Sequence, residues 1–256
     1  MARPHRLPAE SSKRGTAVSS SSIKIVWIYP DLLSTYGDQG NTIVLERRAA
    51  LRGIPTETVH VRSDERVPAD GDIFLLGGGE DRPQILAAQR LSRDGGLLEA
   101  AGRGAVVFAV CAGYQLLGHE FGGEEGQPVA GLGLLDIRSG RGDTRAVGEI
   151  VGDVSAELNV PRITGFENHQ GVTRLGPSVQ PLARVVAGVG NGDGNGFEGA
   201  YRGHVLGTYM HGPALVRNPG LADLLLRWAV GQELQPIDDS WAGRLREERL
   251  KAVLPS

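Results

Sequence analysis

The chain has a single cysteine, Cys111, placed where a nucleophile could work. The apolar, β-branched run 104–110 before it is too short for an independent helix and is typical of a buried parallel strand. The run 114–118 just after it is predicted to begin a helix. A thiol between a strand end and a helix start lies on a sharp turn, which requires small neighbours; these are Ala109, Ala112 and Gly113.

The environment expected for Cys111 favours a reactive thiol. A helix N-terminus lowers the pKa of a nearby thiol and directs free N–H groups toward a developing oxyanion. The alternative is a buried structural cysteine, which is common for this residue type. The turn context favours the nucleophile.

A cysteine nucleophile needs a base, and the histidines are the candidates. His211 directly follows an apolar strand predicted at 205–209, so it should lie at the same end of the sheet as Cys111. His169, within the polar run 166–171 at the end of another predicted strand, is the second candidate. The remaining histidines fit structural or solvated positions better: His5, His60, His119 and His204.

The elements that must position these groups alternate between strand and helix in the first half of the chain. Helices are predicted around 44–51 and across 84–101, with a break near Gly95 and Gly96. Such alternation predicts an α/β fold with a mainly parallel central sheet and helices on both faces. The predicted strands are 23–29, 56–61, 72–76 and 104–110.

The second half contains short β-like runs and two late helices, at 221–230 and 240–253. The Gly- and Asn-rich run 190–196 predicts a hairpin turn or mobile loop. The last helix, rich in Arg and Glu, should pack on the outside or against a partner. The predicted β runs are 132–137, 147–151, 162–166, 182–187, 197–201 and 205–209. We expect a disordered extension at 1–22, one domain at 23–231 and a helical extension at 232–256.

The composition excludes several classes of protein. A net charge of −3 gives no sign of a nucleic-acid or acidic-membrane partner. One cysteine excludes an internal disulfide framework and fits a reducing cytosol. No apolar run approaches the roughly 20 residues needed to span a bilayer. Residues 1–22 lack the apolar stretch of a secretory signal. We therefore expect a soluble, cytoplasmic protein and no metal site.

Three elements in order resemble the class I (triad-type) glutamine amidotransferases. They are the glycine loop 77–79, the cysteine turn 111–115 and the strand leading to His211. The resemblance extends over 23–230 and implies a three-layer, flavodoxin- or Rossmann-like α/β glutaminase fold. The cysteine turn and the Gly-Thr-Tyr-Met-His-Gly-Pro run 207–213 are most similar to the cobyric-acid-synthase branch.

A narrower resemblance is to the glutaminase subunits of lipid II isoglutaminyl synthase. It is carried by Tyr-Gly-Asp-Gln-Gly-Asn at 36–41, Gly-Gly-Gly-Glu-Asp-Arg at 77–82 and Gly-Phe-Glu-Asn-His at 165–169. It implies a Mur-ligase-like, MurT-type synthetase partner in a heterodimer, which amidates D-glutamate of the lipid II stem peptide. ATP and Mg²⁺ are expected on that partner, and no cofactor in this chain, because the loop at 77–82 lacks the Gly-Lys-Ser/Thr of a phosphate-binding loop.

The resemblance assigns roles around the cysteine. Cys111 would attack the side-chain amide of L-glutamine, giving a γ-glutamyl thioester and ammonia, and His211 would move the protons. The backbone N–H groups of Ala112, Gly78 and Gly79 would form the oxyanion hole, where one donor is typically worth about 3 kcal/mol of barrier.

The α-carboxylate of glutamine needs a fixed cation. Arginines follow the predicted strand 132–137 in a loop that could cover the pocket: Arg138, Arg141 and Arg145. Alignment with the family favours Arg145 as the substrate-binding residue, and a solvated surface arginine is the alternative. Gln115 would hydrogen-bond the substrate, as the family's glutamine does, and Asn168 and His169 would help to line the pocket.

One position departs from the family pattern. Many triad-type amidotransferases carry a glutamate two residues after the catalytic histidine, and this chain has Pro213 there. Another acid could serve, the site could be a Cys-His dyad, or the partner could complete the triad.

Three other functions stay open. The chain could be the glutaminase of another ATP-dependent amidase of corrinoid type, or a γ-glutamyl cysteine hydrolase that needs no partner. It could also be a weakly active regulatory subunit that only binds glutamine or a partner.

Overall fold

The computed structural model of the protein describes residues 22–34, 37–123 and 127–254. The disordered extension expected at 1–22 lies outside the described residues, except for its last residue.

The central sheet is mainly parallel, as the sequence predicts. Its strand order is β11-β12-β4-β3-β1-β2, and β11 pairs antiparallel with β12 while all other neighbours are parallel. The strands are β1 (Ile23–Ile28), β2 (Thr56–Val61), β3 (Ile73–Leu76), β4 (Val106–Val110), β11 (Ala200–Arg202) and β12 (Val205–Thr208).

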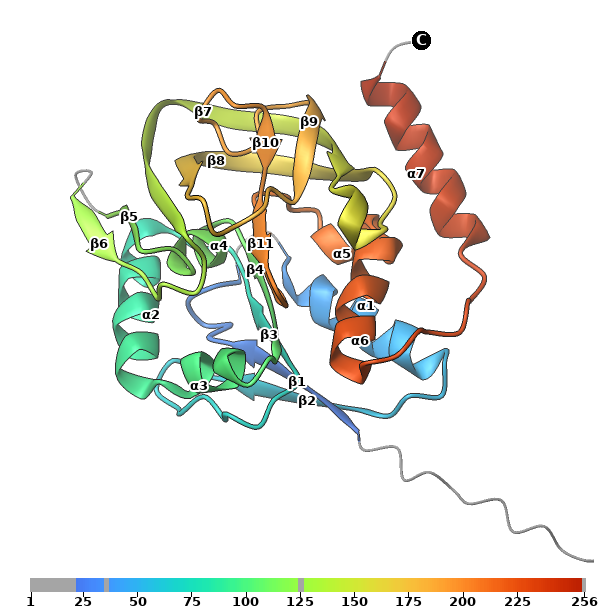
Figure 1. Ribbon diagram of the computed structural model, residues 1–256, viewed down its shortest axis with the longest axis horizontal. Coiled ribbons are helices and arrows are strands. Elements are labelled where there is room, and N and C mark those ends of the chain that lie inside the picture. The colour runs from blue at the N-terminus through green and yellow to red at the C-terminus, as the bar shows by residue number, and fades with distance from the viewer. Residues whose placement is uncertain (1–21, 35–36, 124–126, 255–256) are drawn as a thin grey trace, which may run out of the picture.

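Helices cover both faces of this sheet (Figure 1). The helix predicted across 84–101 is broken at Gly95, whose φ of +77° ends α2 and precedes α3. The helices are α1 (Gln39–Ala50), α2 (Asp81–Asp94), α3 (Gly96–Gly102), α4 (Ala112–Leu116), α5 (Ala214–Arg217), α6 (Pro219–Val230) and α7 (Ser240–Val253).

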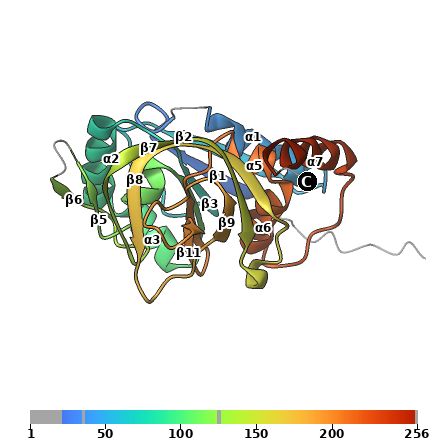
Figure 2. The ribbon, with the colours of Figure 1, turned by 90° about the horizontal axis from the view of Figure 1, so that it is seen from above.

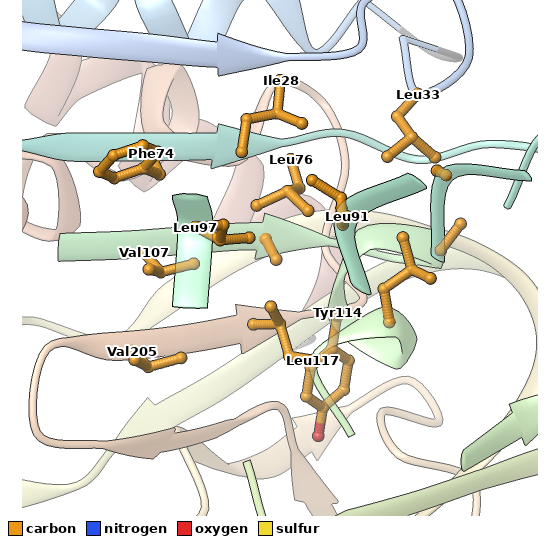
Figure 3. Close-up of a cluster of buried hydrophobic side chains, with 14 of the residues drawn as sticks. Ile28, Leu33, Phe74, Leu76, Leu91, Leu97, Val107, Tyr114, Leu117 and Val205 are labelled. Atoms are coloured by element: carbon orange, nitrogen blue, oxygen red, sulfur yellow. The ribbon is translucent and has the colours of Figure 1, made fainter. Parts of the chain in front are cut away.

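Each face of the sheet packs into its own apolar core. Val26 and Ile28 of β1 join the core formed with α2 and α3, part of which is shown in Figure 3. Ile25 and Trp27 of the same strand join the core formed with α1 and α6. Strands buried on both faces appear in the sequence as continuous apolar runs, so β1, β3 and β4 were predictable.

A second sheet lies beside the first and is built around one long antiparallel pair, β7 (Ile137–Val154) and β8 (Ile163–Leu175). Figures 1 and 2 show this pair running across the molecule. The other strands are β5 (Glu120–Gly122), β6 (Pro128–Ala130), β9 (Ala183–Ala187) and β10 (Phe197–Glu198). The run 190–196 connects the antiparallel strands β9 and β10, as expected for a hairpin connection.

The sequence prediction for β7 was wrong. The strand expected at 132–137 does not form. Instead, β7 begins at Ile137 and continues through the region where the sequence predicts an arginine-bearing loop. Several β7 side chains are exposed, and its register against β8 shifts between Arg141 and Ala146. The strand therefore has no regular apolar alternation to detect, and pairing with β8 defines it.

The prediction for β8 was also too short. The run 162–166 is only the start of this strand, so His169 lies within β8 rather than at a strand end. The short elements β5, β6 and α5 were not predicted.

The last helix, α7, has no buried residue, in agreement with its expected external position. Arg48 of α1 connects the residues just before α7 to the rest of the domain. Its guanidinium donates to Asp223 of α6 and to Asp239, with N–O distances of 2.6–2.7 Å. Trp241 at the start of α7 is 76% exposed. No helix among the described residues is long and apolar enough to cross a bilayer.

The packing of Tyr114 on Gly207 gives a test of this core. A Cβ at Gly207 would lie 2.0 Å from the Tyr114 ring, so Gly207→Ala should destabilise the fold by about 1–3 kcal/mol. The melting temperature should fall by about 2–4 °C for each kcal/mol. Gly102→Ala is the control, because a Cβ there meets no atom within 4 Å. Equal melting temperatures for the two variants would contradict this packing.

Candidate active site

Cys111 occupies the turn between β4 and α4. Its φ of +54° and ψ of −108° lie where a residue with a side chain is rarely found, at a typical cost of about 1–3 kcal/mol. Gly113 is required at this turn, because a Cβ there would come within 2.8 Å of the Gly77 oxygen and 2.9 Å of Leu76 Cβ. The chain therefore makes the sharp turn that the sequence predicts.

The expectation that the helix N-terminus would lower the pKa of Cys111 is wrong. Burial raises the pKa of this thiol to about 12, and the nearby Asp38 carboxylate raises it further. The Ala112 N–H and the Arg145 guanidinium act in the opposite direction but are outweighed. The helix α4 spans only 5 residues, so its dipole is small. The thiol is thus protonated at neutral pH, so a nucleophilic Cys111 would need a base.

His211 follows β12, the strand next to β4, and so lies at the same end of the sheet as Cys111. β12 pairs in parallel with β4, and Thr208 lies opposite Val110, so both chains leave the sheet at the same end. A methyl group on Gly78 would come within 2.9 Å of His211 Cε1 and 3.5 Å of Cys111 Cβ. The two side chains therefore lie on either side of one glycine.

The second sheet fixes the backbone of this histidine. Phe166 of β8 exchanges two backbone hydrogen bonds with His211, at 2.8 and 3.1 Å. The side chain of His211 is 2% exposed.

A buried carboxylate, Asp38, faces His211 and was not identified from the sequence. Its Oδ1 lies 3.8 Å from His211 Nδ1, and its Oδ2 accepts a hydrogen bond from the Gly78 N–H at 2.6 Å. The signal available in the sequence was its place in the polar run 36–41, between β1 and α1, at the strand-end edge where polar groups gather.

Pro213 packs against the segment that carries this acid. A Cβ at Gly40 would lie 2.3 Å from Pro213 Cγ. The backbone N–H of Leu215 donates to Asn41 Oδ1 at 2.9 Å, which fixes the same contact between α5 and α1. Of the three options for the third triad member, an acid elsewhere in the chain thus has a candidate in Asp38.

A polar pocket opens beside Cys111 and gathers residues from α2, α4, β7 and β8. Of the site residues predicted from the sequence, Gly78 and His211 are not in its lining. The others line it: Gly79, Cys111, Ala112, Gln115 and Arg145. The other side chains lining it include Glu80, Asp81, Gln84, Arg141, Asn168, His169 and Gln170.

Gln115 is held with a defined amide orientation. Its Oε1 accepts from Gln84 Nε2 at 2.8 Å, and its Nε2 donates to the Tyr209 hydroxyl at 2.9 Å. The Tyr209 hydroxyl is in turn 2.7 Å from Thr173 Oγ1. The orientation of the amide is therefore set before any substrate binds.

The three candidate arginines lie within β7 rather than in a loop, and they differ in their contacts. Arg138 pairs with Glu120 at 3.1 Å, and Arg141 lies 3.5 Å from Asp81. Arg145 is exposed and donates from Nε to the neutral side chain of Asn168 at 2.8 Å.

The three expected oxyanion-hole donors have different surroundings. The Ala112 N–H acts to lower the pKa of Cys111, and Gly79 lines the pocket. The Gly78 N–H donates to Asp38 in this structure.

The remaining histidines have other contacts. His169 lines the pocket, but its ring stacks on Tyr209 at a centroid distance of 3.8 Å, and its Nδ1 lies 2.9 Å from the Gly171 oxygen. His60, His119 and His204 contact Trp27, Asp136 and the Gly104 oxygen, respectively. Over residues 22–34, 37–123 and 127–254, no group of three or more His, Cys, Asp or Glu is placed to hold a metal ion.

The raised thiol pKa predicts the pH dependence of Cys111 alkylation. Because only the thiolate reacts, the rate with iodoacetamide should rise about tenfold per pH unit from about pH 7 to 10, without a plateau. Mass spectrometry measures this cleanly in a chain with one cysteine. A small-molecule thiol assayed in parallel should level off near its ordinary pKa of about 8.5. A plateau for Cys111 near that same pH would show that burial does not dominate.

Known proteins resemble this chain in sequence. Residues 24–219 match the CobB/CobQ-like glutamine amidotransferase domain. The lipid II isoglutaminyl synthase (glutamine-hydrolyzing) subunit GatD of Staphylococcus aureus is 36% identical, over 88% of this chain and 91% of that subunit. GatD of Streptococcus pneumoniae is 34% identical over 83% and 84%. A cobyric acid synthase of Sphingopyxis alaskensis is 34% identical, but over 66% of this chain and only 34% of that enzyme.

Solved structures share the fold. A glutamine amidotransferase crystal structure superposes with a TM-score of 0.54 at 22% identity, covering 80% of this chain and 98% of that one. A glutamine amidotransferase of Thermotoga maritima gives 0.52 at 14% identity, covering 90% and 86%. The family resemblance inferred from the sequence is confirmed, and the chain is an enzyme of the CobB/CobQ-like glutamine amidotransferase family.

Proposed function

We propose that this chain is the glutaminase subunit of a lipid II isoglutaminyl synthase. The observation that carries the proposal is the 36% identity to GatD of Staphylococcus aureus, which extends over about nine-tenths of both chains. In this proposal the chain hydrolyses L-glutamine, and a Mur-ligase-like, MurT-type partner uses the ammonia to amidate D-glutamate of the lipid II stem peptide.

The proposed reaction begins with a protonated thiol. Nδ1 of His211 faces Asp38, so Nε2 takes the proton of Cys111 as the sulfur bonds to the amide carbon of glutamine. The N–H groups of Ala112 and Gly79 stabilise the oxyanion. The C–N bond then breaks, and the proton returns from His211 to the departing ammonia. His211 next deprotonates a water that hydrolyses the γ-glutamyl thioester, releasing glutamate and restoring the thiol.

Two residues of the pocket lining, Arg145 and Gln115, bind the substrate in this proposal. Arg145 carries a charge that matches the α-carboxylate of glutamine, and its neighbour Asn168 leaves that charge uncompensated. In this proposal Gln115, whose amide is oriented by Gln84 and Tyr209, hydrogen-bonds the substrate.

The partner completes the proposed enzyme. ATP and Mg²⁺ belong to the synthetase subunit, with which this chain forms a heterodimer in the cytoplasm. The exposed helix α7 is available for subunit contacts. A corrinoid amidase is the second candidate, favoured by the CobB/CobQ-like domain, but the chain spans only about a third of the matched cobyric acid synthase.

The first test is ammonia release from L-glutamine, with and without the Mur-ligase-like partner, ATP and Mg²⁺. We expect low activity from the chain alone and higher activity in the complex, with conversion of the D-glutamate α-carboxyl of lipid II to carboxamide by mass spectrometry. Cys111→Ala should abolish both. Full activity without the partner would support the partner-independent hydrolase, and amidation of cobyrinate derivatives would support the corrinoid enzyme.

Asp38→Asn tests the role of the buried acid. The variant keeps an oxygen for the Gly78 N–H but removes the charge facing His211, so kcat should fall about tenfold or more, equivalent to about 1.4 kcal/mol, with KM unchanged. Asp136→Asn is the matched control, because Asp136 also faces a histidine, His119 at 3.2 Å, outside the pocket. An unchanged kcat for Asp38→Asn in the complex would assign the third triad position to the partner or to none.

A further inference from the structure

Arg145 of β7 and Asn168 of β8 form a pair in the lining of the pocket. The Arg145 Nε donates to Asn168 Oδ1 at 2.8 Å, and both residues line the pocket that holds Cys111. Arg145 lies where the register of β7 against β8 shifts, just before Ala146, which pairs with His169. Asn168 pairs with Val147 in regular register, so its position is fixed by the strand.

The chemistry of this contact favours recognition of a carboxylate. A guanidinium has five N–H donors, and the Nε–H is the one bound to Asn168. The paired Nη groups, which match the two oxygens of a carboxylate, face no acceptor in that contact. Since Asn168 is neutral, it holds the guanidinium without compensating its charge, unlike Asp81 beside Arg141.

An exposed arginine without such a contact would bind a carboxylate less tightly. A free arginine side chain loses rotamer entropy when it is immobilised. A contact that restricts the side chain before the ligand arrives removes part of that cost from binding.

β8, the strand that carries Asn168, also fixes the backbone of His211, the proposed base. Phe166, two residues before Asn168 in β8, holds the backbone of His211 through two hydrogen bonds. One rigid strand therefore sets the separation between the substrate's charged end and the reacting amide.

We propose that Asn168 is a positioning residue that orients Arg145 to select glutamine by its free α-carboxylate. The proposal rests on the proposed glutaminase function. Asn168 acts through Arg145 and takes no part in the proton transfers, so its loss should affect substrate binding and not the chemical step.

The experiment is a double-mutant cycle on the glutaminase reaction of the full chain in complex with its synthetase partner. Asn168→Ala should raise KM for L-glutamine about tenfold, with kcat within about twofold, because one positioning contact is lost. In an Arg145→Ala background, Asn168→Ala should have no further effect. Asn168→Asp, which keeps the acceptor oxygen for Nε, should retain the ordered arginine but weaken binding, because it compensates the charge.

A second substrate separates positioning from a structural role. 4-Aminobutyramide is glutamine without its α-carboxylate, so Asn168→Ala should leave its kcat/KM unchanged. Asp153→Ala is the matched control: it removes a 2.6 Å contact to Arg162 at the other end of the β7–β8 pair and should change neither substrate's kinetics. Equal losses for both substrates, or a further loss in the Arg145→Ala background, would overturn the proposal.

The failure of this proposal is distinguishable from failure of the proposed function. No glutamine hydrolysis by the wild-type complex would refute the function itself. An unchanged KM in Arg145→Ala would remove the arginine, and with it Asn168, from substrate binding while leaving the glutaminase intact.

Discussion

The parallel pairing of β12 with β4 is the interaction on which the site depends. It places the two chains that end in Cys111 and His211 side by side at one edge of the sheet. Gly78 at the end of β3 lies between them, and no larger residue fits there without touching both side chains. Cys111, His211 and the glycine loop 77–79 thus follow three adjacent strands of one sheet.

Burial sets the electrostatics of this arrangement. It keeps the Cys111 thiol protonated, so the proposed attack by Cys111 requires a base. The same burial makes the Asp38 carboxylate costly unless it is hydrogen-bonded, and the Gly78 N–H meets that need. The Gly78 N–H therefore stabilises the Asp38 carboxylate close to His211, in a segment that packs against Pro213.

The second sheet supplies the other half of the pocket. β7 and β8 carry Arg145, Asn168 and His169, and β8 also fixes the backbone of His211. Because these strands contribute to the core shared with α6, their position relative to the central sheet is set by packing. The residues proposed to bind the substrate and those proposed to carry out the reaction are therefore positioned by different sheets that share one core.

The amino-acid sequence alone predicts most of the central sheet, the turn at Cys111 and the strand end at His211, because buried strands and small-residue turns leave strong local patterns. It did not determine the long β7–β8 pair, whose exposed residues and shifted register lack such a pattern. Nor did it identify Asp38, which lies 173 positions before His211 and meets it only through the fold. The direction of the Cys111 pKa also depended on tertiary structure, because burial is a property of the packed molecule and outweighed the local helix dipole.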